Sequence, residues 1–321
     1  MYFAAMRLVP VLFPCDLGRS QRGQYVVGGC RGAPDRLLDG LESEGVRLAA
    51  PVTVAVDTPT DAAPESTAKF AKTAAQAVER LAEVVESINA ASDFPLVLGG
   101  DHLGMLGHVL GHSRRFPQGI GLAVLSDAFL DLEIPGPPAY DDPEKRRDPL
   151  HSSTGDLCRM VLSAALGRWP DDEVFIGGLA RQCRVKNENT SVLGIRAPAS
   201  AMVSKAERSA HVDVWTMERL ELDGESAYRS VLNRHLAWGP IALSVDVSGL
   251  DSHLMNAVSD PVPDGLEWGF LKRSLDQCLP HVDRILGLDI CEVDPTRDDA
   301  HQGSLVRFAE TLAPFLRRLS R

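Results

Sequence analysis

Three short acidic segments of the 321-residue sequence carry the side chains best suited to metal chemistry. They are GGDH at residues 99–102, SDAFLD at 126–131 and DVSGLD at 246–251. Each one follows or ends an apolar run of the kind that forms a buried strand. Because ligand sites of parallel α/β sheets lie beyond the carboxyl ends of the strands, we expect the three segments to meet. One imidazole and three or four carboxylates would then form an oxygen-rich pocket that suits Mn²⁺ or Mg²⁺.

Each segment taken alone also has an ordinary structural interpretation. A Gly-Gly-Asp turn often only caps the following helix, and an aspartate at a strand end often only hydrogen-bonds a turn. His102 by itself could be a buried histidine with satisfied hydrogen bonds. The combination of all three segments, rather than any one of them, therefore favours a metal site.

The elements that must position these segments alternate between strand and helix. Strands are predicted at the apolar runs 8–13, 52–56, 96–98, 122–125, 174–176, 212–215, 241–247 and 285–290. Helices are predicted at 66–89, 104–113, 157–166, 225–236, 269–278 and 305–319, the first with a capping sequence, STAK, at 66–69. About eight alternating strands predict a single α/β domain over residues 1–321, with a mainly parallel sheet covered on both faces.

Composition restricts the class of protein. The apolar fraction is 44% and no apolar run approaches the ~20 residues of a membrane-spanning helix. The net charge of −11 disfavours nucleic acid or an anionic membrane as a partner, because both require a basic surface. The first residues lack the order of a signal peptide, and the six cysteines include no Cys-x-x-Cys pair. We therefore predict a cytoplasmic protein without a disulfide framework or zinc ribbon, in which most cysteines are small buried apolar residues.

Residues 132–150 (LEIPGPPAYDDPEKRRDPL) interrupt the alternation with five prolines and many charges. A solvated surface loop and a lid over the site are both compatible with this composition. The lid interpretation rests on position, because the segment directly follows the second acidic segment.

Four blocks of the sequence resemble, in order, the signature blocks of the ureohydrolases, the arginase–agmatinase–formimidoylglutamase superfamily. They are LVLGGDH at 96–102, DAFLD at 127–131, SVDVSGLD at 244–251 and LDICEVDP at 288–295. The resemblance implies a three-layer α/β/α arginase-like domain with two adjacent manganese ions. It also implies a small cationic guanidino or amine substrate and a homo-oligomer, usually a trimer or hexamer.

The resemblance provides the ligands of only one of those two ions. It assigns four residues to the more enclosed ion: His102, Asp127, Asp131 and Asp246. The second ion would need a histidine and an aspartate where this sequence has Phe129 and Ser248. A phenyl ring has no lone pair, and a hydroxyl is a poor substitute for a carboxylate. One Mn²⁺ per chain is therefore predicted rather than two.

Other positions of the family site are also altered. The family pattern Gly-Asn-x-His-Gly is matched by GDLCR at 155–159, so Asp156 replaces a substrate-contacting asparagine and Cys158 a proton-shuttling histidine. Glu292 stands where the family would hold a guanidinium by a charge-assisted contact, and Asp260 replaces a threonine near the substrate. Cys158 would shuttle a proton or bind a metal only if its pKa were lowered, and a structural cysteine at a helix start is the alternative.

These comparisons define the candidate site. The candidate catalytic residues are Asp127, His102 and Cys158, and the candidate substrate-binding residues are Glu292, Asp156 and Asp260. The first hypothesis is a divergent metal-dependent hydrolase that uses activated water to cleave a C–N bond in a small guanidino or amidino compound. The second is a catalytically silent relative with a ligand-binding or regulatory role, and a changed reaction on the same scaffold is a third.

Overall fold

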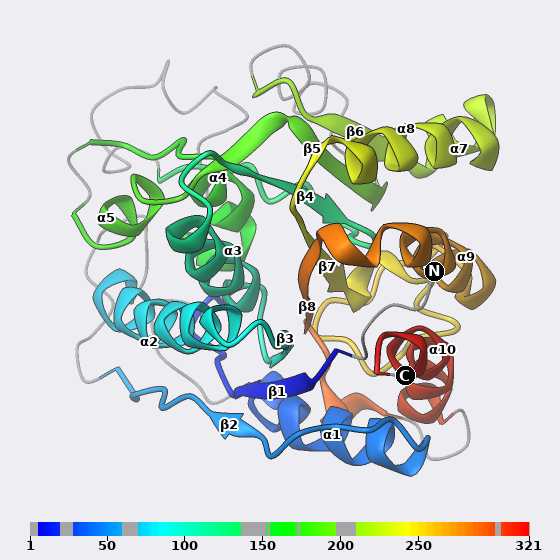
Figure 1. Ribbon diagram of the computed structural model, residues 1–321, viewed down its shortest axis with the longest axis horizontal. Helices are drawn as coiled ribbons and strands as arrows, with labels where there is room; N and C mark the ends of the chain where they lie inside the picture. Colours follow the sequence, from blue (N-terminus) through cyan, green and yellow to red (C-terminus); the bar gives the residue numbers. More distant parts are fainter. Residues whose placement is uncertain are drawn as a thin grey trace.

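The computed structural model describes residues 6–19, 28–59, 70–135, 152, 155–171, 174–196, 210–298 and 303–320. Within these residues, eight strands form one sheet in the order β2-β1-β3-β8-β7-β4-β5-β6, and every neighbouring pair is parallel (Figure 1). The strands are β1 (Leu8–Phe13), β2 (Val52–Thr53), β3 (Phe94–Gly99), β4 (Ile120–Val124), β5 (Val185–Ile195), β6 (Asp213–Thr216), β7 (Ile241–Asp246) and β8 (Ile285–Cys291).

Helices cover both faces of this sheet, which confirms the expected three layers (Figure 1). One layer consists of α2 (Ala71–Ala90), α3 (Leu103–Arg115), α4 (Val161–Ala165) and α5 (Ile176–Ala180). The other consists of α1 (Ala33–Ser43), α8 (Glu225–Trp238), α9 (Trp268–Cys278) and α10 (Ser304–Leu319), with α7 (Met217–Asp223) directly before α8. Short 3-10 turns are η1 (Gly29–Gly32), η3 (Leu157–Met160), η4 (Val247–Gly249), η5 (Leu279–Arg284) and η6 (Pro295–Arg297).

Strand β1 shows why the buried strands read as continuous apolar runs. Val9, Val11 and Phe13 join the core shared with α2 and α3, whereas Leu8 and Leu12 join the core shared with α1 and α10. Because successive side chains of a strand point to opposite faces, a sheet covered on both faces needs apolar residues at every position. The apolar runs in the sequence thus locate the central strands of the sheet.

Two strand assignments from the sequence need correction. The strand predicted at 174–176 is wrong, because Ile176 begins α5 and the side chains of Val174 and Phe175 are exposed. Strand β5 was not predicted, because its first half, VKNEN, is mostly polar and only its second half is fully buried. The other predicted strands overlap β1–β4 and β6–β8.

Two helix predictions also change at their ends. The long helix begins at Ala71, and the proposed capping residues 66–69 lie outside the described residues. The helix predicted at 157–166 is a 3-10 turn, η3, followed by the short helix α4. Residues 136–150 of the proline-rich segment also lie outside the described part, so the lid interpretation stays a prediction.

The remaining expectations concern membranes and cysteines. None of the helices described here combines the length and the apolar character needed to cross a membrane. All six cysteines are buried and free of disulfide bonds, which confirms their expected role as small apolar side chains.

Candidate metal centre and adjoining cavity

The acidic segments meet at the carboxyl edge of the central strands. β3 leads into His102, β4 leads into Asp127 and Asp131, and β7 ends at Asp246. β3, β8, β7 and β4 are consecutive in the sheet, so the ends of these strands lie side by side. The four side chains are all buried, and each offers one ligand atom within 4.8 Å of the others. We refer to these four residues as the acidic cluster.

Within the acidic cluster, the imidazole faces three carboxylate oxygens. His102 Nδ1 lies 2.7 Å from Asp131 Oδ2, 3.4 Å from Asp246 Oδ2 and 3.7 Å from Asp127 Oδ2. The Oδ1 atoms of Asp127 and Asp246 each accept a hydrogen bond of 2.7 Å from the backbone N–H two residues further along. These backbone bonds hold both carboxylates so that their Oδ2 atoms point toward Nδ1.

The electrostatics of the acidic cluster favour a cation. Burial, helped by the charge of Glu292, raises the pKa of Asp246 to about 7. Burial and the two neighbouring aspartates raise the pKa of Asp127 well above its usual range. Burial opposes protonation of His102, but its hydrogen bond to Asp131 and the surrounding carboxylates raise the pKa of His102 above its usual value. A divalent cation bound here would replace the imidazole proton as the counter-charge, and one nitrogen with three oxygens suits Mn²⁺.

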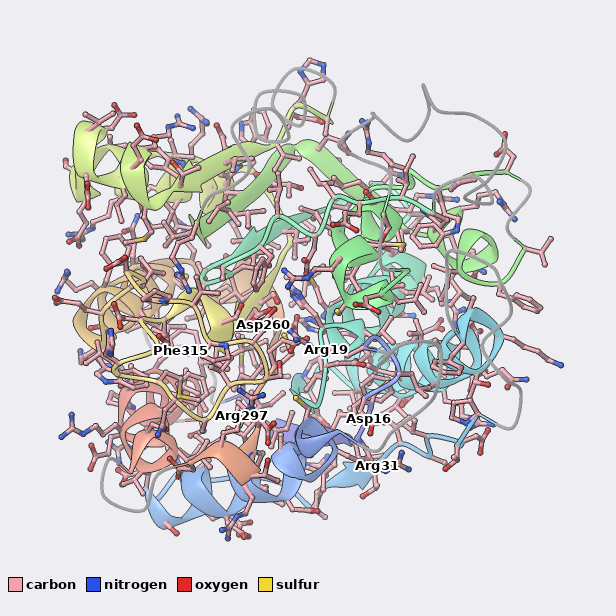
Figure 2. All side chains as sticks on the ribbon, turned by 180° about the vertical axis from the view of Figure 1, so that it is seen from behind. Asp16, Arg19, Arg31, Asp260, Arg297 and Phe315 are labelled. Atoms are coloured by element: carbon pink, nitrogen blue, oxygen red, sulfur yellow. The ribbon has the colours of Figure 1, made fainter. Side chains whose placement is uncertain are left out.

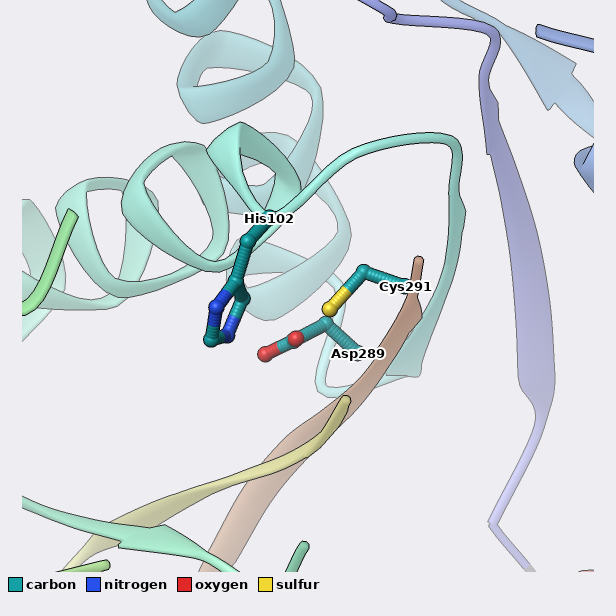
Figure 3. A group of neighbouring side chains, drawn as sticks. All are labelled: His102, Asp289 and Cys291. Atoms are coloured by element: carbon teal, nitrogen blue, oxygen red, sulfur yellow. The ribbon is translucent and has the colours of Figure 1, made fainter. Parts of the chain in front are cut away.

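A second group of possible metal ligands includes the same histidine. His102, Asp289 and Cys291 also bring their ligand atoms within 4.8 Å of one another (Figure 3). Asp289 already has partners on both oxygens, since Ser244 Oγ donates to Oδ1 at 2.7 Å and His108 Nδ1 lies 2.8 Å from Oδ2. Burial raises the pKa of the Cys291 thiol, which disfavours the thiolate that a metal would require. The group is best explained as a buried polar cluster that connects β8 with β7 and α3.

The positions that resemble the second-ion ligands make other contacts. The guanidinium carbon of Arg159 lies 3.2 Å from the ring centroid of Phe129, a cation–π contact. Ser248 is buried, and its hydroxyl accepts a hydrogen bond of 3.2 Å from the backbone N–H of Ala128. Neither side chain adds an imidazole or carboxylate to the acidic cluster, in agreement with a single-ion site.

Positive and negative side chains alternate in a row that extends from the ring of Phe129 to the carboxylate of Glu292. Arg159 Nη2 lies 2.5 Å from Asp260 Oδ2, and Arg19 Nη1 lies 3.7 Å from the same oxygen. Figure 2 labels Arg19 and Asp260, which lie near each other. Arg19 Nε then donates a hydrogen bond of 2.9 Å to Glu292 Oε2, and Arg19 Nη2 lies 2.8 Å from the same oxygen. Phe129, Arg159, Asp260, Arg19 and Glu292 are called the charge row below.

Glu292 is the buried end of the charge row. Its side chain is 1% exposed; Oε1 accepts a hydrogen bond of 3.1 Å from the backbone N–H of His102, and Oε2 accepts one from the Ser259 hydroxyl. Burial alone would raise the pKa of Glu292, but Arg19 and Ser259 outweigh it and hold the pKa below the usual value. Glu292 is therefore ionised, as a guanidinium anchor must be.

A cavity of about 290 Å³ adjoins the charge row. Its lining includes Asp156, Cys158, Asp260 and both arginines of the row, but none of the four residues of the acidic cluster. Burial raises the pKa of Cys158 well above the usual thiol value, although Arg19 opposes the effect. Cys158 is thus a neutral thiol, and the lowered pKa that a proton shuttle would need is not present.

Three arginines of this region did not emerge from the sequence as site residues. Arg19 and Arg159 belong to the charge row, and Arg196 follows β5 as a buried guanidinium. Arg196 donates to backbone oxygens of Gly194, Ser248, Gly249, Leu250 and Val262. Arg159 lies inside the GDLCR match, which was a usable signal, whereas no pattern in the sequence marks Arg19 or Arg196.

Comparison with known proteins identifies the family of the chain. The profile of the arginase family matches residues 8–313. The chain belongs to the arginase family. Among curated arginases, that of Brevibacillus brevis is 28% identical over 298 residues, which covers 92% of this chain and 93% of the relative. Arginase-1 of Rattus norvegicus is 28% identical over 252 residues, covering 75% of this chain and 70% of the relative.

Solved structures of arginase-family proteins share this fold. The arginase of Bacillus cereus matches with a TM-score of 0.77 at 21% identity, covering 97% of this chain and 98% of that one. The agmatine ureohydrolase of Thermoplasma volcanium matches with a TM-score of 0.64 at 17% identity, covering 98% and 91%. The resemblance to the ureohydrolase superfamily that the four sequence blocks indicated is confirmed.

Proposed function

We propose that this arginase-family chain is a metal-dependent hydrolase that cleaves a C–N bond in a small guanidino or amidino compound. The observation that carries the proposal is the convergence of His102, Asp127, Asp131 and Asp246 on one buried point. Family membership supports the reaction class, and the altered second-ion positions support one Mn²⁺ per chain.

The acidic cluster would hold the ion and orient the reacting groups. When bound, the ion would supply the positive charge that lowers the pKa of a water molecule toward neutrality. Asp131 fixes the imidazole of His102, and backbone N–H groups fix the carboxylates of Asp127 and Asp246. Cys158, as a neutral thiol in the cavity wall, would donate a hydrogen bond rather than act as a nucleophile.

The cavity would receive the cationic end of the substrate. Glu292 is the proposed amidinium anchor, because it is ionised, buried and already bound to a guanidinium. Asp156 and Asp260 would add acidic character to the cavity wall. The proposal includes a homo-oligomer, a trimer or hexamer on the family pattern, and a cytoplasmic location as predicted from the sequence.

A second candidate is a catalytically silent protein that binds a small cationic ligand or regulates another subunit. The charge row favours it, because Arg159 lies against Phe129 and Arg19 fills the Glu292 anchor. In that case the fold would be retained for binding, and the acidic cluster would be a structural feature.

Metal content and turnover decide between the two candidates. Protein expressed with manganese and then desalted is expected to carry about one ion per chain by elemental mass spectrometry, and to release urea or ammonia from one of a panel of guanidino and amidino compounds. Asp127→Ala should lose both the metal and the turnover, whereas Asp283→Ala, at an exposed aspartate, should keep both. A folded protein without metal would overturn the hydrolase proposal, and turnover that survives metal removal would overturn metal dependence.

A further inference from the structure

The side chain of Arg19 makes with Glu292 the contact that an amidine substrate would make. The guanidinium donates one hydrogen bond of 2.9 Å from Nε to Oε2, and its Nη2 lies 2.8 Å from the same oxygen. A guanidinium that both hydrogen-bonds and ion-pairs with a buried carboxylate makes the charge-assisted contact expected of a bound ligand. The proposed anchor is therefore occupied by a residue of the chain itself.

We propose that Arg19 is a built-in occupant of the ligand anchor, which moves from Glu292 to Asp260 when a guanidino or amidino ligand enters. Arg19 thereby sets the affinity of the site and selects ligands able to replace its hydrogen-bonded ion pair with Glu292. The inference rests on the proposed function in one respect only, the assignment of Glu292 as the anchor.

Glu292 cannot accept a ligand beside Arg19. Its Oε1 is bound by the His102 N–H, and its Oε2 by Arg19 and by the Ser259 hydroxyl. With only 1% of its side chain exposed, Glu292 has no route toward a ligand elsewhere in the cavity. The incoming cation must therefore take the place of the Arg19 guanidinium.

The surroundings of Arg19 allow its side chain to move while its backbone stays in place. The preceding residue, Gly18, donates its N–H to Asp101, and its carbonyl oxygen accepts a hydrogen bond of 3.1 Å from the Cys158 N–H. The Arg19 side chain is 29% exposed, so it has access to the solvent side of the cavity. We therefore expect the Arg19 side chain to move while the backbone at Gly18 stays in place.

Asp260 provides the second position for the displaced guanidinium. Its Oδ2 already lies 3.7 Å from Arg19 Nη1, and its side chain is 40% exposed. Leaving Glu292 for Asp260 exchanges one carboxylate partner for another, so the displaced charge keeps an ion pair. The Arg159 guanidinium, 2.5 Å from the same oxygen, holds the Asp260 carboxylate in position.

The test is a double-mutant cycle on ligand affinity. Isothermal titration calorimetry would measure the Kd of methylguanidinium for the full-length chain, with Mn²⁺ and after EDTA treatment. Arg19→Met keeps the side-chain stem and removes the competing charge, so the Kd should fall about 10-fold, or about 1.4 kcal/mol. Asp260→Asn removes a carboxylate of the cavity wall and should raise the Kd in both backgrounds. The increase should be roughly 3-fold larger in the presence of Arg19 than in the Arg19→Met background, where no guanidinium needs a second partner.

Arg297→Met is the matched control. Arg297 lines the same cavity but pairs with Asp294 rather than with Glu292, so its replacement should change the Kd less than about 2-fold. A Kd for Arg19→Met equal to that of the wild type would overturn the inference. An effect of Asp260→Asn that is equally large with and without Arg19 would overturn the transfer to Asp260.

Two further measurements apply if Arg19→Met folds poorly because it leaves Glu292 unpaired. Millimolar methylguanidinium should then raise the Tm of Arg19→Met more than that of Arg297→Met, which keeps the weaker wild-type affinity; an equal response of both variants would overturn the inference. Arg19→Lys should show an intermediate Kd. Because binding is measured without turnover, an inactive protein leaves the inference intact, whereas an active enzyme with the same KM before and after Arg19→Met refutes the inference alone.

Discussion

The two halves of the candidate site handle charge in opposite ways. The acidic cluster places three carboxylates around one imidazole, and two of those carboxyls have raised pKa values because they are buried close to other negative charges. The charge row instead pairs its carboxylates, Asp260 and Glu292, with the guanidinium groups of Arg159 and Arg19. One half needs a cation, and the other half already contains two.

This difference shows that the altered positions of the site act together. Arg159 lies on the ring of Phe129 and also binds Asp260, so three of the departures from the family pattern are in direct contact. Loss of the second-ion histidine is accompanied by a fixed positive charge at the same place. Unlike a bound ion, a guanidinium cannot be removed by a chelator, so this half should keep its charge balance without metal.

Removal of Arg196 should have the largest effect on the comparison, because Arg196 fixes the loop that follows β7 at the acidic cluster. That loop carries Asp246 at its start and Ser248 two residues later, and the buried guanidinium donates to the carbonyl oxygens of Ser248 and Gly249. Arg196→Met would remove the donor to the Ser248 carbonyl, whereas the Gly249 carbonyl would keep the hydrogen bond of 2.9 Å from the Leu266 N–H. The free energy of unfolding should fall by about 3 kcal/mol or more in denaturant titrations.

The control for this variant is Arg234→Met. Arg234 is 54% exposed and pairs with Asp213 at the surface, so its loss should cost less than about 1 kcal/mol. Equal losses for Arg196→Met and Arg234→Met would show that the loop after β7 does not depend on the buried guanidinium.

Restoring the missing ligands would convert the altered half into a second acidic half. The double variant Phe129→His with Ser248→Asp introduces both missing second-ion ligands. It leaves the Arg159 guanidinium beside residue 129. We expect the double variant to stay near one ion per chain and the triple variant with Arg159→Gly to bind about two, because a guanidinium repels the incoming cation. Elemental mass spectrometry checks both contents.

Arg159→Gly alone is the matched control for the triple variant, and its metal content should remain that of the wild type. If the double variant already binds a second ion, Arg159 does not oppose the metal. If the triple variant binds only one, the loss of ligands and the presence of the guanidinium do not explain the single-ion site.

The sequence predicted the acidic cluster better than the charge row for a physical reason. Buried strands covered on both faces leave apolar runs, and the acidic residues follow these runs directly, so local pattern places both the sheet and the cluster. The charge row depends on contacts between distant segments: Arg19 and Glu292 are separated by 273 positions, and Arg159 and Asp260 by 101. No local periodicity contains such pairs.

The same reasoning explains the errors in the fold. The first half of β5 is polar and partly exposed because it runs beyond the covered part of the sheet, so it has no apolar signature. In the apolar run at 174–176, Val174 and Phe175 lie exposed just before α5, so hydrophobicity does not report a buried strand there.

The smallest expected loss of stability concerns a substitution in β6, which lies at the edge of the sheet and outside both halves of the site. Asp213 Oδ2 lies 2.8 Å from His235 Nε2, and this hydrogen bond, with help from Arg234, holds the pKa of Asp213 below its usual value. Because the folded-state pKa is lowered, the stabilisation is complete above the unfolded value of about 3.9 and is lost as the pH falls through the folded value.

Asp213→Asn should therefore lower the free energy of unfolding by less than about 1 kcal/mol at neutral pH, since the carboxylate is partly exposed. Its difference from the wild type should shrink as the pH falls below about 4, as measured by denaturant titrations at a series of pH values. The metal content should not change, because Asp213 touches neither the acidic cluster nor the charge row in any contact described above. A difference that is independent of pH would rule out the lowered pKa as its source, and a loss of metal would show that the site extends to the edge of the sheet.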